Sequence, residues 1–600
     1  MNIETQRHSL AHIMAYAVQE LFRDKGAVSF GVGPVIENGW YYDIHTEQPI
    51  TENDLKRIEK KMLDIIKQKV SFTRTELPID DAIIQFKKMN QQYKVELLHD
   101  LKTHGTTNLN ERRDRVNPVS TDTVSIYTTG DFVDLCRGPH VENTQEITVA
   151  FKLTSLAGAY WRGDEKNPQL QRVYAVAFET QQELDDYLHM REEAIKRDHR
   201  KIGKELGLFV FSDLVGPGLP LYTHHGMTIL SALKNYSREL RTKMGYQEVQ
   251  TPQINKAALF HTSGHYDKYK QDMFRVVSNY TDEEYYLKPM NCPQHTQLYA
   301  SRMRSYKDLP VRIADFSLLY RDEKPGELSG LTRLRSFSQD DSHCFCREDQ
   351  IEHECSLLLN AIQEAMQTYG MNYSIRLSLR DESQKEKYLG DDKIWETSQN
   401  ALRSMLKQSG INYEEAPGEA AFYGPKMDLL AHDALGRTWQ LSTIQLDMNM
   451  PERFGLEYID EDGSQKTPLM IHSALVGSPE RFFGILIEHH AGAFPVWLSP
   501  VQVAILPVSE KFLDNARKLS LHMQSTSIRV EIDESNESVG KKIRNAETSK
   551  IPYMLVLGEK EAQSDTLAVR KRGSKETIPL SRDEFCAMIQ EKIRTKSLEV

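Results

Sequence analysis

The sequence is poor in cysteine and contains no long apolar segment. Six cysteines among 600 residues are too few for a disulfide framework, so we expect a reducing compartment in which thiols stay free to bind metal or react. No run of about 18 apolar residues occurs, which excludes a membrane-spanning helix. The polar N-terminal segment lacks the apolar region of a secretory signal. These absences predict a cytoplasmic protein without membrane association.

The chain also lacks the excess of positive charge found in proteins that bind nucleic acid over much of their surface. Its net charge is −11, although a local basic face could still bind RNA. With 39% hydrophobic and 27% charged residues, the composition is that of a globular protein with both helices and strands. A chain of this length is expected to form about three or four domains.

The segment 311–345 has the most informative charge pattern. Two apolar-rich stretches, 313–320 and 334–345, flank a polar loop that contains glycine and proline, which predicts two antiparallel strands joined by a long loop. Arg321 and Arg333 lie at the ends of this loop. Because a guanidinium group matches the geometry of phosphate and carboxylate, they indicate an anionic ligand. The alternative is a solvated hairpin with paired surface charges.

The N-terminal region holds two pairs of potential metal or catalytic side chains. An amphipathic helix is predicted over 5–22, with Thr5 as its N-cap and with His8 and His12 on one face. Cys136 and His140 follow later, and the intervening glycine and proline place them on a loop. The alternative is that these are surface or core pairs without chemistry. Further predictions in this region are a hairpin at Asn38–Gly39 and helices over 53–69 and 79–93.

Three features divide the remainder of the chain. The highly charged stretch 181–207 predicts a solvated linker helix between two domains. The segment 470–490 predicts a strand followed by a helix whose first turn carries Arg481, which is a natural phosphate site. From Val501 onward, short β-rich runs alternate with helical stretches, which predicts a small α/β domain.

Taken together, the ordered motifs of the chain resemble those of bacterial threonyl-tRNA synthetases, which are class II aminoacyl-tRNA synthetases. The resemblance covers nearly all 600 residues and rests on HSLAH, GPVIENGWYYD, DLCRGPH, RDHRKIGKELGL, KPMNCPQH, YRDE, FSQDDSHCF, FYGPKMD, IQLD, MIHSALVGSPERF and PYMLVLGEKE. It implies a multidomain α+β protein whose catalytic core is the antiparallel sheet of class II synthetases. The implied domains are an α+β editing domain (1–180), a linker helix (181–207), the catalytic domain (208–499) and an α/β anticodon-binding domain (500–600).

In the catalytic domain, the resemblance implies sites for ATP and for one zinc ion. The residues that match the ATP site are Arg321, Glu323, Arg333 and Arg481. The family's zinc ligands match Cys292, His343 and His472, which the spacing in the sequence does not select. A Cys-His-His site leaves coordination positions open, as catalytic zinc requires. Magnesium would accompany the ATP phosphates.

The resemblance also implies how threonine is selected. Residues that match the amino-acid pocket are Met290, Gln339, Asp341, Tyr423 and Gln445. Valine lacks the hydroxyl that such a site engages and is therefore rejected, whereas serine keeps the hydroxyl and requires a second, hydrolytic site. The residues that match this editing site are His8, His12, Lys94, Asp134, Cys136 and His140. Water activation without a tightly bound metal is expected there, and a zinc site is the alternative.

For the C-terminal domain, the resemblance implies that anticodon bases are read by Asn536, Arg544, Glu561 and Arg570. The chain departs from the family pattern in three places. We expect the protein to lack the small ubiquitin-like N-terminal domain common in the family, Gln294 stands where glycine is usual, and the segment 441–445 reads LSTIQ instead of CGTVQ.

The function expected is that of a homodimeric threonine–tRNA ligase. It would activate L-threonine with ATP, transfer it to tRNA(Thr) and hydrolyse mischarged seryl-tRNA(Thr). One alternative is a non-charging paralogue that only binds tRNA, which degraded motifs would favour. Arg321, Arg333, Arg481 and the three zinc positions are all intact. Another alternative is a metallohydrolase inferred from the N-terminal His and Cys pairs alone, which leaves two thirds of the chain unexplained.

Overall fold

The chain forms two compact units, Met1–Glu192 and Glu193–Val600. The computed structural model describes residues 2–107 and 122–600. The boundary between the units falls within helix α6 (Gln181–Arg197). The single helix predicted over 181–207 is instead two helices, because Asp198 leaves the helical conformation and caps the start of α7 (His199–Glu205). Among the described residues, no helix has the length and hydropathy that a membrane-spanning segment needs.

The larger sheet of the first unit supports helix α1 (Ile3–Phe22). Its strands are β1 (Val28–Phe30), β2 (Val35–Ile36), β3 (Gly39–Thr46), β7 (Ala150–Tyr160) and β8 (Gln169–Phe178), in the order β1-β3-β8-β7 with β2 beside β3. The hairpin predicted at Asn38–Gly39 is confirmed, with Asn38 at positive φ. The predicted cap at Thr5 is wrong, because Asn2 caps α1 through its side chain. Helix α2 (Glu52–Lys67) packs against both α1 and β7.

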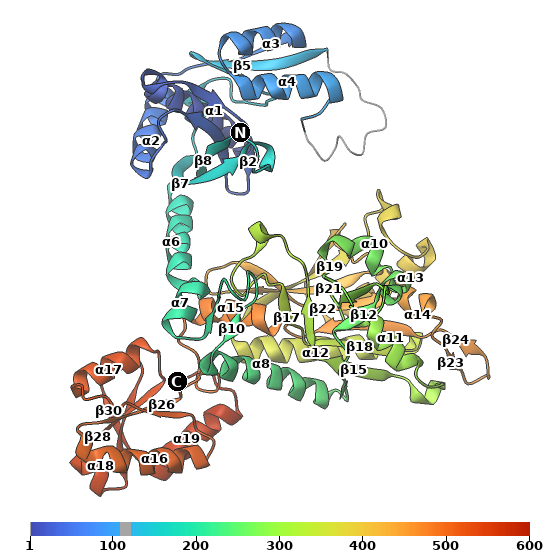
Figure 1. The fold of residues 1–600 in the computed structure, drawn as a ribbon, viewed down its shortest axis with the longest axis vertical. Helices are drawn as coiled ribbons and strands as arrows, with labels where there is room; N and C mark the ends of the chain where they lie inside the picture. Colours follow the sequence, from blue (N-terminus) through green and yellow to red (C-terminus); the bar gives the residue numbers. More distant parts are fainter. Residues whose placement is uncertain (1, 108–121) are drawn as a thin grey trace. The chain divides into compact units, whose positions relative to one another are not determined.

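A smaller antiparallel sheet completes the first unit. Its strands are β4 (Phe72–Pro78), β5 (Thr123–Thr129) and β6 (Phe132–Leu135). The single helix predicted over 79–93 is two helices, α3 (Ile79–Lys88) and α4 (Gln92–His104). Asn90 adopts positive φ between them, a conformation that ends a helix. Figure 1 shows α3 and α4 next to β5.

The second unit is built around an eight-stranded, mainly antiparallel sheet. Its strands run in the order β11 (Gln247–Glu248), β15 (Val311–Asp315), β18 (Asp341–Cys346), β25 (Leu469–Ala474), β22 (Thr438–Asp447), β21 (Lys426–His432), β19 (Asn372–Leu379) and β20 (Tyr413–Pro417). The class II fold predicted from the resemblance requires such a sheet. Short additional strands are β9 (Phe209–Val210), β10 (Leu221–Tyr222), β12 (Ile254–Lys256), β13 (Arg275–Val276), β14 (Tyr285–Leu287), β23 (Tyr458–Ile459) and β24 (Gln465–Lys466).

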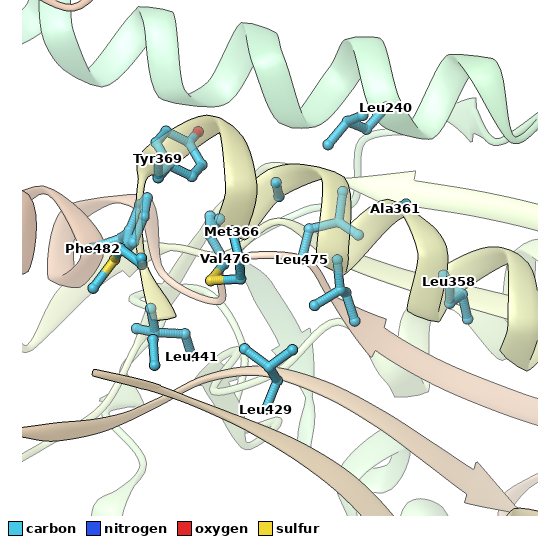
Figure 2. Close-up of a cluster of buried hydrophobic side chains, with 14 of the residues drawn as sticks. Leu240, Leu358, Ala361, Met366, Tyr369, Leu429, Leu441, Leu475, Val476 and Phe482 are labelled. Atoms are coloured by element: carbon cyan, nitrogen blue, oxygen red, sulfur yellow. The ribbon is translucent and has the colours of Figure 1, made fainter. Parts of the chain in front are cut away.

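One face of this sheet is buried against helices, which leaves the other for the site. Alternate residues of β18, β22 and β25 enter the main apolar core together with α12 (Ile351–Tyr369). Figure 2 shows Leu358, Ala361 and Met366 of this core, with Leu240 from α8 (His224–Lys243). Further helices of this region are α9 (Ala257–Ser263), α10 (His265–Tyr269), α11 (Cys292–Ala300), α13 (Asp392–Ser409), α14 (Asn449–Arg453) and α15 (Pro479–His490).

The hairpin predicted over 311–345 is present, but each of its strands is interrupted. The first consists of β15 and β16 (Leu318–Tyr320), and the second of β17 (Ser336–Ser338) and β18. The pairs β15/β18 and β16/β17 are both antiparallel. The strand and helix predicted over 470–490 are also confirmed, as β25 and α15.

The C-terminal segment forms a mixed sheet with helices on both faces, as its alternating pattern predicts. The strand order is β27 (Val530–Ile532), β26 (Val503–Pro507), β28 (Tyr553–Leu557), β29 (Thr566–Lys571) and β30 (Thr577–Ser581). Helices α16 (Leu513–Ser525) and α19 (Arg582–Arg594) contribute to the core on one face, and α17 (Val539–Thr548) to a smaller core on the other. Helix α18 (Glu559–Gln563) follows β28 (Figure 1).

Candidate active site

Strand register brings distant polar residues into one row across the large sheet. Gln445 of β22 pairs with His472 of β25, which in turn pairs with His343 of β18. Because side chains alternate between the faces of a strand, Asp341 shares the face of His343, while Cys344 and Cys346 enter the core on the opposite face. The row therefore lies on the face opposite α12.

A cysteine completes this row from a helix. Cys292 is the first residue of α11, and the ligand atoms of Cys292, His343 and His472 all lie within 4.8 Å of one another. All three residues are buried. Nε2 of His343 lies 2.9 Å from Nδ1 of His472. The structure thus brings together the three predicted zinc ligands, which are 180 positions apart at their extremes.

The far nitrogen of each histidine has its own partner. Nε2 of His472 lies 3.0 Å from a carboxylate oxygen of Asp447, so it carries the proton and donates. Nδ1 of His343 lies 2.6 Å from Nδ1 of His295, whose other nitrogen points toward Asp315 at 3.8 Å. When Nε2 of His472 and Nδ1 of His343 carry the protons, the two nitrogens that face each other, Nδ1 of His472 and Nε2 of His343, both present lone pairs. Such a pair fits a bound cation, and histidine and thiolate are preferred zinc ligands.

The predicted threonine residues surround this cluster. The ring of Tyr423 stacks on that of His472 with centroids 4.9 Å apart, and its hydroxyl donates to Gln445. Asp341 accepts a hydrogen bond from Asn291, the neighbour of Cys292. Met290 contacts His265 through its sulfur. Gln339 and Gln445 both line the adjoining hollow.

That hollow has a volume of about 580 Å³ and is lined by all four residues predicted to bind ATP. Arg321 follows β16, Arg333 lies in the loop of the hairpin, and Arg481 lies in the first turn of α15. Arg333 is half-exposed and pairs with Glu323 at 2.8 Å and with Glu327 at 2.7 Å. Three positive groups thus converge on one concave surface.

The electrostatics of the hollow favour an anion. Burial, followed by repulsion from Arg321 and Arg333, lowers the pKa of Arg481. Burial likewise lowers the pKa of Arg321. Within the described part of the chain, Nε of Arg481 has no hydrogen-bond partner. A phosphate chain would supply the missing acceptors and relieve the repulsion.

A second cluster lies in the first unit. His8 and His12 come from α1, while Cys136 and His140 follow β6, and their ligand atoms also lie within 4.8 Å of one another. Sγ of Cys136 is 3.2 Å from His8 and 3.3 Å from His140. The cluster faces a cavity of about 340 Å³ that is also lined by Lys94 and Asp134. All six residues predicted for editing are therefore neighbours.

The N-terminal cluster is electrically neutral apart from one ion pair. Burial raises the pKa of the Cys136 thiol to about 11. Burial, with the neighbouring His12 and His8, holds the pKa of His140 far below its usual value. Asp134 is paired with Lys94 and lies 3.3 Å from Nε2 of His12. The imidazoles are therefore neutral, and a neutral imidazole keeps one lone pair that can accept a hydrogen bond from water.

Comparison with known proteins identifies the family. Three family models match: the class II core domain of the G, H, P, S and T tRNA synthetases at residues 274–490, the anticodon-binding domain at 502–592, and the second additional domain of threonyl- and alanyl-tRNA synthetases at 124–174. A threonine–tRNA ligase of Gloeobacter violaceus is 48% identical over 98% of this chain and 92% of its own length. The chain belongs to the threonine–tRNA ligase family.

Other members of the ligase family give the same result. A threonine–tRNA ligase of Sulfurihydrogenibium is 46% identical over 99% of this chain and 89% of its own length. Among solved structures, the RNA-binding domain of threonyl-tRNA synthetase from Cryptosporidium parvum matches with a TM-score of 0.63 and 36% identity, over 66% of this chain and 98% of its own. The predicted family and fold class are confirmed, and these matches favour the ligase interpretation over a non-charging paralogue or a metallohydrolase.

The four residues predicted to read the anticodon have different local environments. Asn536 and Arg544 are exposed, before and within α17. The Glu561 carboxylate accepts from the Gly558 backbone at the start of α18, as a helix cap does. Arg570 of β29 pairs with Glu547 at 2.6 Å.

Several residues that support the two clusters have no spacing pattern in the sequence that would identify them. Asp447 lies in the quoted IQLD motif and His295 in KPMNCPQH, yet neither was assigned a role. Tyr42, which contacts both Asp134 and Lys94 in the first unit, was also missed. Each acts through a contact with a residue far away in the chain, so only strand register or packing could have indicated it.

Proposed function

We propose that this chain is a threonine–tRNA ligase that activates L-threonine with ATP and transfers it to the 3′ end of tRNA(Thr). One observation carries the proposal: the arginine-lined hollow and the Cys292–His343–His472 cluster adjoin each other on one face of one sheet. A nucleotide and an amino acid held there would lie side by side, which is the requirement for adenylate formation.

The residues of the hollow would position ATP and neutralise its charge. Arg321 and Glu323 would hold the α-phosphate and the adenine, and Arg333 and Arg481 the outer phosphates, accompanied by Mg²⁺. The threonine carboxylate then attacks the α-phosphorus, and pyrophosphate leaves. No general base is needed, because the attacking carboxylate is already ionised. Fixed positive charges stabilise the charge that develops during transfer. A ribose hydroxyl of the terminal adenosine of tRNA finally attacks the carbonyl carbon of the adenylate; the new ester forms, AMP leaves, and the hydroxyl proton is released.

We propose that Cys292, His343 and His472 hold one zinc ion. Its open positions would take the amino and hydroxyl groups of threonine, which explains rejection of valine. The other pocket residues, Met290, Gln339, Asp341, Tyr423 and Gln445, would orient the substrate. The facing lone pairs of the two histidines and the carboxylate behind His472 support this assignment.

For the first unit, roughly residues 1–180, we propose hydrolysis of mischarged seryl-tRNA(Thr). The neutral histidines of the second cluster would activate water, with Lys94 and Asp134 beside them. For residues 500–600 we propose anticodon binding through Asn536, Arg544, Glu561 and Arg570. The family models matched at 124–174 and 502–592 support both assignments.

We also propose that the ligase is a cytoplasmic homodimer. The large apolar side chains of Val210, Phe211, Leu214 and Leu221 are exposed, Leu214 almost completely. Exposed large apolar side chains that gather in one short segment are typical of protein–protein interfaces. Analytical ultracentrifugation tests the dimer, and substitution of Leu214 and Phe211 by Ser is expected to produce monomers.

Threonine-dependent ATP–pyrophosphate exchange tests the central proposal. The enzyme is expected to catalyse exchange, and extraction of zinc with a chelator is expected to abolish it until zinc is restored. Folded, zinc-loaded protein without exchange activity would rule out the ligase. Replacing threonine by serine in the assay should leave activity, whereas valine should give almost none.

A further inference from the structure

The RDHRKIGKELGL motif, residues 197–208, belongs to none of the sites described above. It forms α7 and the residues on either side, and its buried His199 belongs, with Asp198 and Glu488, to a third group of potential metal ligands among the described residues. Both ring nitrogens of His199 are engaged, however. Nδ1 lies 2.6 Å from Glu488, and Nε2 lies 2.9 Å from the backbone nitrogen of Leu331. The ring therefore has no lone pair left for a metal.

These two bonds define the tautomer of His199. The backbone N–H of Leu331 can only donate, so Nε2 accepts and carries no proton. Nδ1 must then carry the proton, which it donates to the Glu488 carboxylate. A second donation to Glu488 comes from the backbone N–H of His199. His199 is therefore a neutral connector between α15 and the loop of the hairpin.

The loop end of this connection is part of the ATP hollow. Leu331, Thr332 and Arg333 all line it. The preceding Gly330 has φ +49°, and a Cβ there would lie 2.1 Å from Nε2 of His199. Glycine is thus required for the backbone to approach the ring. On the α15 side, a Cβ at Gly484 would lie 3.2 Å from the Leu331 side chain and 3.5 Å from the His199 ring.

The other end of the connection leads to the second phosphate-binding arginine. Glu488 belongs to α15, the helix whose first turn carries Arg481. Its second oxygen bonds to Arg437, whose guanidinium group lies 5.2 Å from the centroid of the Trp439 ring. The guanidinium group of Arg481 lies 5.8 Å from the same ring. His199 is thus linked to the loop of Arg333 through one nitrogen and to the surroundings of Arg481 through the other.

We propose that His199 is a positioning residue for ATP. In its neutral tautomer it fixes the loop that carries Arg333 relative to the helix that carries Arg481, so that both arginines meet the outer phosphates together. This inference rests on the proposed ligase function, because it assigns the hollow to ATP. It makes no use of the zinc cluster or of the threonine pocket.

Three substitutions at one position separate the two bonds. His199→Gln places an amide oxygen near the position of Nε2 and keeps the acceptor for Leu331. His199→Asn places its amide near Nδ1 and keeps the bond to Glu488 only. His199→Ala removes both. In pyrophosphate exchange, we expect KM for ATP to rise roughly 10- to 100-fold in the Ala and Asn variants, as for other outer-sphere supports. KM for threonine should stay unchanged, and Gln should restore KM for ATP to within a few-fold.

A second measurement does not depend on activity. In the ATP-free enzyme, amide hydrogen exchange in the segment 328–334 should accelerate in the Ala and Asn variants and remain slow in the Gln variant. His490→Ala is a matched control at the end of the same helix, where the ring packs on Phe494 and His489. It should leave KM for ATP and the exchange of this segment unchanged.

The results distinguish positioning from a purely structural role. Wild-type KM for ATP and slow amide exchange in His199→Ala would overturn the proposal. An equal rise of KM for ATP and KM for threonine, with KM for ATP as high in the Gln variant as in the Asn variant, would also overturn it. If the Ala variant does not fold, the comparison of Gln with Asn decides alone. A wild-type enzyme without exchange activity would refute the ligase function, while the amide-exchange pattern would still test the role of His199.

Discussion

The two Cys–His clusters of this chain use the same side chains in different surroundings. In the second unit, His472 is backed by the Asp447 carboxylate, and His343 is backed by His295, which points toward Asp315. In the first unit, the outer nitrogen of His8 meets a backbone carbonyl and that of His140 meets the hydroxyl of Ser9. The third histidine of this cluster, His12, does face a carboxylate, because its Nε2 lies 3.3 Å from Asp134. That carboxylate is already paired with Lys94.

A set of donor atoms does not by itself define a metal site, because the groups behind the donors also influence metal affinity. Carboxylates behind ligating histidines fix the tautomer and increase ligand basicity. A neutral carbonyl or hydroxyl fixes the tautomer less firmly and increases ligand basicity less. We therefore expect the second-unit cluster to retain a metal and the first-unit cluster to act through neutral imidazoles.

Removing the cysteine from each cluster should give the largest contrast. Cys292→Ala is expected to lose bound zinc and to reduce threonine activation by more than about 100-fold, because losing a ligand exceeds the usual effect of losing an outer partner. Cys136→Ala is the matched control and should keep both zinc content and activation. Metal analysis and pyrophosphate exchange measure the two effects. Equal loss of zinc in the two variants would remove the distinction.

Substitution of His12, whose Nε2 faces Asp134, should affect hydrolysis of seryl-tRNA and leave threonine activation intact. His12→Ala should slow hydrolysis of seryl-tRNA by roughly 100-fold or more, the usual contribution of an acid–base group. Threonine activation should remain normal. Deacylation of preformed seryl-tRNA measures the first effect and pyrophosphate exchange the second. Clearance of seryl-tRNA at the wild-type rate would show that the editing assignment is wrong.

The sequence predicted the hairpin and the helical face of His8 and His12 because these depend on local periodicity and turn residues. It did not predict the grouping of Cys292, His343 and His472, which came from the family resemblance. That grouping depends on the register between β18 and β25, where a shift of one residue would turn His472 to the other face.

Some local predictions failed for physical reasons. The helix predicted over 79–93 has a continuous periodic pattern, but Asn90 at positive φ divides it. The roles of Asp447 and His199 were also missed, because a hydrogen bond between residues far apart in the chain leaves no spacing pattern. Secondary structure can thus be predicted from a single segment, whereas the residues that hold the site residues in place can be identified only in the assembled fold.

The pH dependence of thiol reactivity tests whether the first-unit cluster holds a metal. With a pKa of about 11, Cys136 should hold roughly 100-fold less thiolate at pH 8 than an ordinary cysteine. Its alkylation by iodoacetamide should be correspondingly slow and should rise with pH up to about 11. Mass spectrometry of the labelled peptide measures the rate. A plateau beginning near neutral pH would instead indicate a thiolate stabilised by bound metal.

The smallest contrast concerns the outer partners themselves. In Asp447→Asn, the side-chain amide can face Nε2 of His472 as a donor, so the imidazole proton is expected to move to Nδ1, the nitrogen that would bind zinc. The expected loss in zinc affinity is about 10- to 100-fold. Ser9→Ala removes the hydroxyl beside His140 and should slow hydrolysis of seryl-tRNA only several-fold, the equivalent of about 1 kcal/mol.

Competition with a chelator measures the first of these effects, and deacylation kinetics the second. Wild-type zinc affinity in Asp447→Asn would mean that the carboxylate does not set the tautomer. In that case the outer partners would not distinguish the two clusters, and His472 would bind zinc as an unsupported imidazole. A large effect of Ser9→Ala together with a small effect of Asp447→Asn would invert the comparison, because the hydroxyl would then be the stronger support.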